Sequence, residues 1–219
     1  MWTTEGLGRV APRPTRVRLD TAEVSFALSV ARRRAAYRRY SGRVDSWGRG
    51  LVGDGSGVRP VWWGTLGECA FAKWADDRLG VGLSVSDADY PFGDPGWDFD
   101  VAGYRVQVKT AGADYTELLV RTTEFTPQRC DLFVRAHWHP PRSRQRVRGL
   151  FGTHELRERA VDLCGWSWYF DVFRHGSVAT GAGGGHCNYV LPADRFRKMD
   201  DLAAILAARL AKEDLDRVG

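Results

Sequence analysis

The sequence predicts a mixed α/β fold, in which a central sheet is flanked by helices and follows a basic helical extension at the N-terminus. Apolar residues recur at helical spacing over 20–40 and 61–80, and alternation typical of strands begins at residue 97. Of the 219 residues, 43% are hydrophobic and 12% aromatic, which is enough for a packed core and argues against disorder. The order of helices and strands therefore indicates helices packed on the faces of a sheet.

The N-terminal part is predicted to be a basic helical arm over 1–55, followed by a single domain over 56–219. Residues 1–19 contain two prolines and are expected to be an extended arm. A helix is expected to follow over 20–40, with Asp20 or Thr21 as its cap. The glycine-rich stretch that comes next indicates a loop or linker.

The remaining elements are predicted in chain order from their periodicity. The second helix is expected to stop at Gly80. Two short strands form a hairpin around an Ala102–Gly103 turn. The predicted elements are a helix over 61–80, strands over 97–101, 104–110, 116–123, 131–138 and 144–152, a helix over 153–161, a strand over 188–192 and an amphipathic helix over 195–209.

No apolar run approaches the roughly 18 residues that a membrane-spanning helix needs, so no membrane span is predicted. The first residues lack a basic-then-apolar signal sequence, and the expected compartment is the cytoplasm. The four cysteines form no closely spaced pair, which favours buried thiols over a disulfide framework or a zinc site.

Positive charge is concentrated at the N-terminus. Residues 1–50 hold eleven arginines and four acidic residues, a local net charge of +7 in a chain whose net charge is +5. A polyanionic partner, most simply DNA, is one explanation, and a solvated basic helix face is the other. The residues proposed to bind the DNA backbone are Arg32, Arg33, Arg34, Arg38 and Arg39 in the predicted helix and Arg142, Arg144 and Arg146 in a later alternating segment.

The predicted hairpin carries a group of residues suited to phosphoryl chemistry. The chain has only four lysines, so a lysine in such a group indicates a chemical need for it. Gln107 and Lys109 share one face of the second strand, and Asp98 lies on the neighbouring strand. A carboxylate and an amide oxygen are hard ligands for Mg²⁺, and an ammonium group can offset charge on a phosphate.

The string from Trp97 to Thr110 resembles the hairpin of the PD-(D/E)xK nuclease superfamily, which has the restriction-endonuclease-like fold. Asp98 matches its first acid, Gln107 to Lys109 its acid-x-Lys, and Glu68 its helical glutamate. The resemblance implies a Mg²⁺-dependent endonuclease that hydrolyses DNA phosphodiesters, with Mn²⁺ as a substitute. It implies that Asp98, Gln107 and Glu68 hold the metal and that Lys109 stabilises the transition state. Restriction, repair and phage replication are all roles compatible with it.

Gln107 departs from this pattern, because the family usually has an acidic residue there. Asp100 shares a strand face with Asp98 and is an alternative or second ligand. Two other functions remain open: an inactive nucleic-acid-binding module on a nuclease scaffold, and a structural or assembly protein. DNA is the expected partner, with a homodimer as a further expectation. Tryptophans around the site, among them Trp62 and Trp74, are expected to pack in the core, with base stacking as the alternative.

Overall fold

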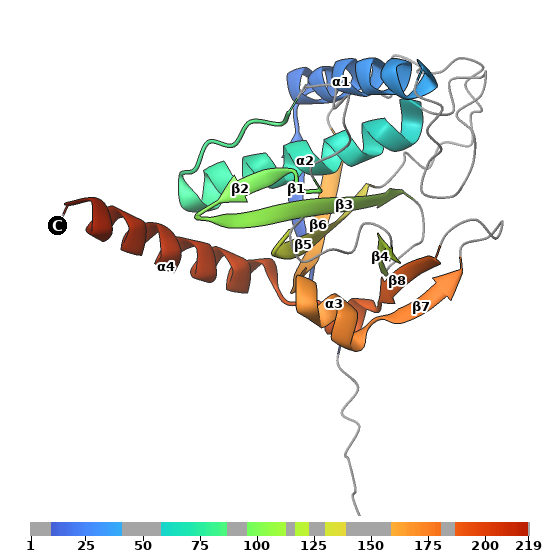
Figure 1. Ribbon diagram of the computed structural model, residues 1–219. Coiled ribbons are helices and arrows are strands. Elements are labelled where there is room, and N and C mark those ends of the chain that lie inside the picture. The colour runs from blue at the N-terminus through green and yellow to red at the C-terminus, as the bar shows by residue number, and fades with distance from the viewer. Residues whose placement is uncertain are drawn as a thin grey trace, which may run out of the picture.

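The computed structural model describes residues 10–40, 58–86, 96–112, 117–122, 130–138, 159–180 and 187–218. These residues form a mixed α/β fold with two sheets. Figure 1 shows the arrangement in layers: α1 lies over α2, α2 lies over the larger sheet, and the smaller sheet with α3 lies on the other side. The predicted α/β class with a mixed central sheet is confirmed.

The larger sheet has the strand order β1-β6-β5-β3-β2. β3 and β5 run parallel, and every other neighbouring pair is antiparallel. The final five residues of the expected N-terminal arm form β1, which pairs with β6. The strands are β1 (Thr15–Leu19), β2 (Phe99–Val101), β3 (Tyr104–Gly112), β5 (Leu132–Trp138) and β6 (Arg159–Trp168).

The smaller sheet has the order β4-β8-β7, with both pairs antiparallel. The short helix α3 joins β6 of the larger sheet to β7 of the smaller one. The sequence predicted neither α3 nor β7, because the aromatic-rich segment there shows no clear period. These elements are β4 (Leu118–Arg121), α3 (Tyr169–His175), β7 (Ser177–Thr180) and β8 (Cys187–Leu191).

The long helices are α1 (Thr21–Tyr40), α2 (Val58–Leu79) and α4 (Met199–Val218). A reciprocal cap begins α1: the Glu23 amide donates to Asp20 Oδ1 at 2.8 Å, and the Asp20 amide donates to Glu23 Oε2 at 2.6 Å. Gly80, with φ +65°, ends α2 as predicted. The C-terminal helix begins at Met199, later than the predicted Arg195, because the backbone of Arg197 instead pairs with Trp166 of β6.

The hairpin prediction is confirmed. Ala102 and Gly103 connect β2 to β3 with φ values of 52° and 73°. Two consecutive positive φ values are the geometry that a two-residue hairpin turn requires, and glycine at the second position adopts it without strain. The turn therefore fixes the register in which Phe99 faces Val106.

Hydrophobic cores lie on both faces of the larger sheet. Val106 and Val108 belong to the core shared with α1 and α2. Phe133 belongs to the second core, which the smaller sheet and α3 complete. Alternate residues of β3 and β5 therefore face opposite sides of the sheet.

Two sequence predictions are corrected by the structure. Residues 159–161, expected to end a helix, begin β6, where Val161 and Leu163 are fully buried between β1 and β5. Pairing on both sides outweighs the local helical pattern there. The predicted strand over 144–152 and the rest of that helix lie outside the described residues. Cys187 is exposed at the start of β8 and not buried as predicted, whereas Cys69 and Cys130 are buried.

No helix in the described part of the chain is both long and apolar enough to cross a bilayer.

Candidate functional site

The hairpin places Asp98 beside β3 at the level of Gln107. The Asp98 amide donates to the Val106 carbonyl at 2.8 Å, which extends the strand pairing beyond the start of β2. The Val108 amide donates to Asp98 Oδ2 at 2.6 Å. The carboxylate is thus anchored to the backbone of β3 between the predicted residues Gln107 and Lys109.

Gln107 and Lys109 lie on the face of β3 that points away from α2. The Thr110 hydroxyl donates to the Gly64 carbonyl of α2 at 3.5 Å, and Val108 lies in the α2 core. Since side chains alternate along a strand, Gln107 and Lys109 face the opposite side, toward the smaller sheet. Gln107 is buried, with 6% of its surface exposed, and Lys109 is half-buried.

Asp98 and Lys109 act on a common neighbour, the thiol of Cys130. Burial is the largest cause that raises the pKa of Cys130 to about 12, while the charge of Lys109 lowers this pKa and that of Asp98 raises it. The two predicted site residues therefore lie within electrostatic reach of one buried thiol. The thiol itself stays protonated at neutral pH and is no nucleophile.

Arg135 is a second cation at this site that the sequence analysis did not identify. It stands opposite Lys109 in the β3–β5 register, and only 2% of its surface is exposed. Its guanidinium donates to three carbonyls, those of Glu117 at 2.8 Å, Lys109 at 3.3 Å and Ala136. Burial lowers the pKa of Arg135 from its ordinary value. The sequence signal that could have identified Arg135 is the presence of one arginine among the apolar residues of β5.

Arg105 and Asp131 join the starts of β3 and β5. The Arg105 amide donates to Asp131 Oδ2 at 2.8 Å, and its guanidinium contacts both carboxylate oxygens at 3.2 Å. The same guanidinium lies 5.6 Å from the ring centroid of Trp97, next to Asp98. This group stabilises the end of the hairpin that carries Asp98.

Glu68 lies on the helix that covers the opposite face of β3. Its carboxylate is paired with Arg34 of α1, at 3.1 and 3.3 Å, and only 8% of the residue is exposed. The Arg34 guanidinium also donates to the Ser86 carbonyl at 2.6 Å. Glu68 therefore lies on the other side of β3 from Gln107 and Lys109, and the structure does not bring it together with them. Across the described ranges, no three His, Cys, Asp or Glu side chains form a group able to hold a metal.

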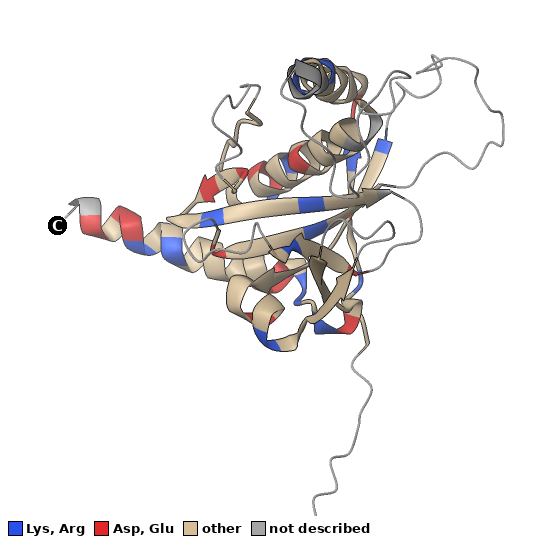
Figure 2. Cartoon of the chain, turned by 45° about the vertical axis from the view of Figure 1, so that its right-hand side comes forward, with Lys and Arg blue, Asp and Glu red and all other residues tan. Residues whose placement is uncertain are grey.

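The proposed DNA-contacting arginines are only partly described. Arg32 and Arg33 are exposed on α1, and Arg34 is half-buried. Arg38 and Arg39 belong to the same helix, but their side chains are outside the described part. Residues Arg142, Arg144 and Arg146 lie outside the described residues altogether. Figure 2 shows basic residues on α1 and on the strands, acidic residues on α2, and residues of both signs on α4.

Trp62 and Trp74 are core residues, with 1% and 2% of their surfaces exposed. Trp62 packs on Trp138, and Trp74 stacks on Phe71. The expectation of core packing is confirmed for both, and base stacking by them is excluded because no face of either ring reaches the surface.

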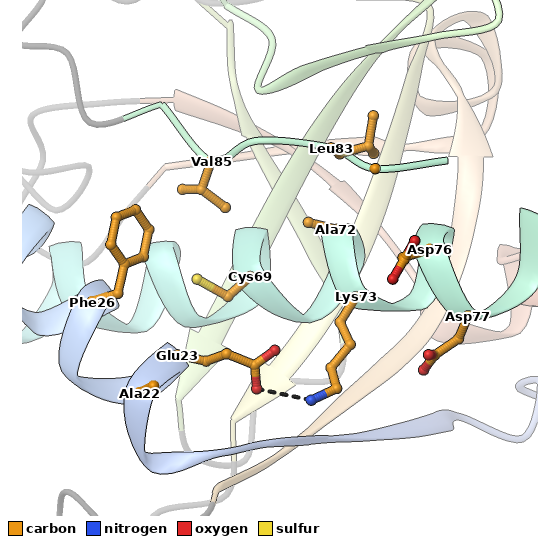
Figure 3. Close-up of a pocket in the computed structure, with 11 residues that line it drawn as sticks. Ala22, Glu23, Phe26, Cys69, Ala72, Lys73, Asp76, Asp77, Leu83 and Val85 are labelled. Carbon is orange, nitrogen blue, oxygen red and sulfur yellow. Dashed lines mark hydrogen bonds and ion pairs between the residues drawn. The ribbon is translucent and has the colours of Figure 1, made fainter. Parts of the chain in front are cut away.

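A separate cavity of about 650 Å³ opens between α1, α2 and residues 82–85 (Figure 3). Lys73 Nζ and Glu23 Oε2 form an ion pair across it at 2.9 Å. Burial is the main cause that raises the pKa of Cys69 in its wall to about 12, so this thiol is protonated at neutral pH. The cavity lies on the outer side of α2 and contains none of the four predicted catalytic residues.

Comparison with protein-family models, with curated proteins and with solved structures finds no match. The likeness to PD-(D/E)xK nucleases stays a prediction from the residues of the hairpin and of α2.

Proposed function

We propose that this protein is a metal-dependent deoxyribonuclease that hydrolyses DNA phosphodiester bonds at a PD-(D/E)xK-type site on a restriction-endonuclease-like fold. The observation that carries the proposal is the anchoring of Asp98 to the β3 backbone beside Gln107 and Lys109. The mixed sheet with a hairpin at its edge supports the fold assignment. The basic N-terminal region supports a polyanionic substrate.

The donor atoms at the site suit Mg²⁺ or Mn²⁺. The Asp98 carboxylate and the Gln107 carbonyl are hard oxygen ligands, and Mg²⁺ commonly binds one or two carboxylates together with waters and substrate phosphates. When bound, such an ion supplies charge that polarises the phosphate and acidifies water. Asp98 and Gln107 would hold it, and the Val108 amide orients the Asp98 carboxylate for that task.

The cations of the site provide the remaining charge. Lys109 is half-buried on the same strand face as Gln107, where its ammonium group can offset charge that develops on the phosphate. Arg135 lies on the neighbouring strand and adds to the positive potential. Attack of a water oxygen on phosphorus would break the bond to the leaving oxygen, and the proton that the water loses to solvent would be balanced by the one that the leaving oxygen takes up.

The second candidate function is that of a DNA-binding module without catalysis. Two observations favour it: Gln107 brings no charge to a metal, and Glu68 is paired with Arg34. A protein with this function is expected to bind DNA in a salt-dependent way and to cleave none with any divalent metal ion.

Supercoiled plasmid incubated with Mg²⁺ or Mn²⁺ distinguishes the two functions. The nuclease nicks or linearises the plasmid, chelation by EDTA stops it, and Lys109→Ala abolishes it. Lys212→Ala is the matched control, because Lys212 is exposed on the outer half of α4. Equal cleavage by Lys109→Ala would refute the assignment of the site. Plasmid binding without cleavage would favour the inactive module.

A further inference from the structure

Two exposed phenylalanines of α3 and a half-buried tyrosine of β8 form an aromatic group. Phe170 is 67% exposed and Phe173 is 60% exposed. The ring of Phe173 meets that of Tyr189 at a centroid distance of 6.0 Å and an interplanar angle of 65°. We call Phe170, Phe173 and Tyr189 the aromatic platform.

The exposure of these rings follows from the geometry of α3. Phe170 and Phe173 are three residues apart and therefore lie on one side of the helix. Tyr169 and Val172 occupy the other side and are buried in the second core. The inward residues of α3 thus pack in the core, and its two phenyl rings face solvent. Large exposed aromatic groups commonly mark binding surfaces.

Exposed basic residues lie on α3 and in the segment that follows β8. Arg174 and His175 directly follow Phe173 and are exposed at the end of α3. Arg197 is exposed and bonds to Asp171 of α3 at 2.9 Å. Arg195 is exposed in the turn that follows β8. Aromatic rings that accept stacked bases, flanked by cations that meet phosphates, are the features of a single-strand binding surface.

A continuous set of contacts connects the platform to the candidate site. Gln107 stands opposite Phe133 in the β3–β5 register. Phe133 stacks on Tyr169 at 6.4 Å, and Tyr169 meets Phe170 edge-on at 5.3 Å. Two buried rings therefore separate Gln107 from the exposed Phe170, on the face of the sheet that carries Lys109.

We propose that the aromatic platform binds unpaired DNA by base stacking, so that the candidate site acts on a single strand, on a single-stranded end or on the locally open stretches of a negatively supercoiled plasmid. This inference rests on the proposed nuclease function. The bases stack on Phe170 and Phe173, of which 67% and 60% are exposed, while Arg174, Arg195 and Arg197 meet the backbone. A duplex stacks its bases internally and offers the platform no open base face.

Binding is measured by fluorescence anisotropy with labelled oligothymidine of about 16 nucleotides, the upper end of a stacking site. EDTA is present, so the result does not depend on cleavage. The double variant Phe170→Ala/Phe173→Ala is expected to lower affinity for the single strand at least tenfold and to change affinity for a duplex of equal length less than twofold. Phe173→Trp is expected to retain binding, because it preserves the ring.

Leu215→Ala is the matched control, since Leu215 is 75% exposed on the outer half of α4. Unchanged single-strand affinity in the double variant would overturn the proposal, as would equal losses for single strand and duplex. Sedimentation that shows the wild type as a dimer and the double variant as a monomer would also overturn it, because a second copy would then occupy the platform. Failure of plasmid cleavage with this binding intact would refute the nuclease alone.

Discussion

The guanidinium of Arg34 and the carboxylate of Glu68 form an ion pair that joins α1 to α2, with a shortest N–O distance of 3.1 Å. Only 17% of the Arg34 side chain and 10% of the Glu68 side chain are exposed. The sequence predicted different roles for them: contact with the DNA backbone for Arg34 and metal binding for Glu68. Their pairing makes the position of α1 part of the environment of Glu68.

Arg34→Ala is expected to destabilise the protein by about 3 kcal/mol, because it removes one partner of a largely buried pair and leaves the Glu68 carboxylate in place. The double variant Arg34→Met/Glu68→Gln is expected to cost less than Arg34→Ala, since no buried charge remains. Urea unfolding of the variants and the wild type measures these differences. A cost below about 0.5 kcal/mol for Arg34→Ala, the level of an exposed pair, would contradict the account.

Gly67→Ala is expected to destabilise the protein by about 2 kcal/mol through overpacking. A Cβ at Gly67 would clash with Thr110 Oγ1 and meet the Thr110 Cβ at 3.1 Å and the Ala136 Cβ at 3.2 Å, so the Thr110 side chain must rotate and α2 must shift slightly from the sheet. Gly64→Ala on the same helix is the matched control, because a Cβ there meets nothing within 4 Å. It is expected to stabilise by up to about 1 kcal/mol through helix propensity. Thermal unfolding measures both, and equal effects would refute the close approach of α2 and β3.

The Arg105–Asp131 contact makes stability depend on pH in the acid range. Burial acts to raise the pKa of Asp131, but the hydrogen bonds from the Arg105 side chain and backbone and the charge of Arg105 outweigh it, so the pKa lies below the ordinary 3.8. A lowered folded pKa means stability that is fully present above the unfolded pKa and is lost as pH falls through the folded pKa. The contribution is about 1 kcal/mol for this half-exposed pair.

Asp131→Asn is expected to remove that part of the loss of stability below pH about 4. Asp214→Asn, on the outer half of α4, is expected to leave it unchanged. Urea unfolding at a series of pH values provides the comparison. Identical acid profiles for wild type and Asp131→Asn would show that the contact does not couple to protonation.

Thiol reactivity is expected to differ sharply among the cysteines. Cys187 is exposed, whereas burial raises the pKa of Cys69 and Cys130 to about 12 and that of Cys164 to about 11. At pH 8 a thiol reagent is expected to modify one cysteine rapidly in the native protein and all four after unfolding. Cys187→Ser is expected to remove the rapid phase. Rapid modification of a second thiol would contradict the burial of Cys69 and Cys130 or the raised pKa of the half-buried Cys164.

Local signals in the sequence account for the elements that were predicted correctly. Gly103 adopts the positive φ of the second turn position without strain, and Asp20 with Glu23 caps α1. The common face of Gln107 and Lys109 likewise follows from strand alternation alone.

The elements that the sequence missed depend on partners far along the chain. β1 is a strand because it pairs with β6, and Arg16 bonds to Asp162 across a separation of 146 residues. No periodicity in five residues reports such a partner. The sequence could not place Arg135 at the site or pair Glu68 with Arg34, because both depend on the packing of β5 beside β3 and of α1 beside α2.

The most direct test of the central claim is the rate of plasmid nicking as a function of Mg²⁺ concentration, for the wild type and for Gln107→Glu. The account predicts a saturable rise in both, with half-maximal nicking at a lower Mg²⁺ concentration in Gln107→Glu, because the new carboxylate adds charge beside Asp98. Absence of Mg²⁺-dependent nicking in both proteins would contradict the claim that Asp98, Gln107 and Lys109 form a nuclease site.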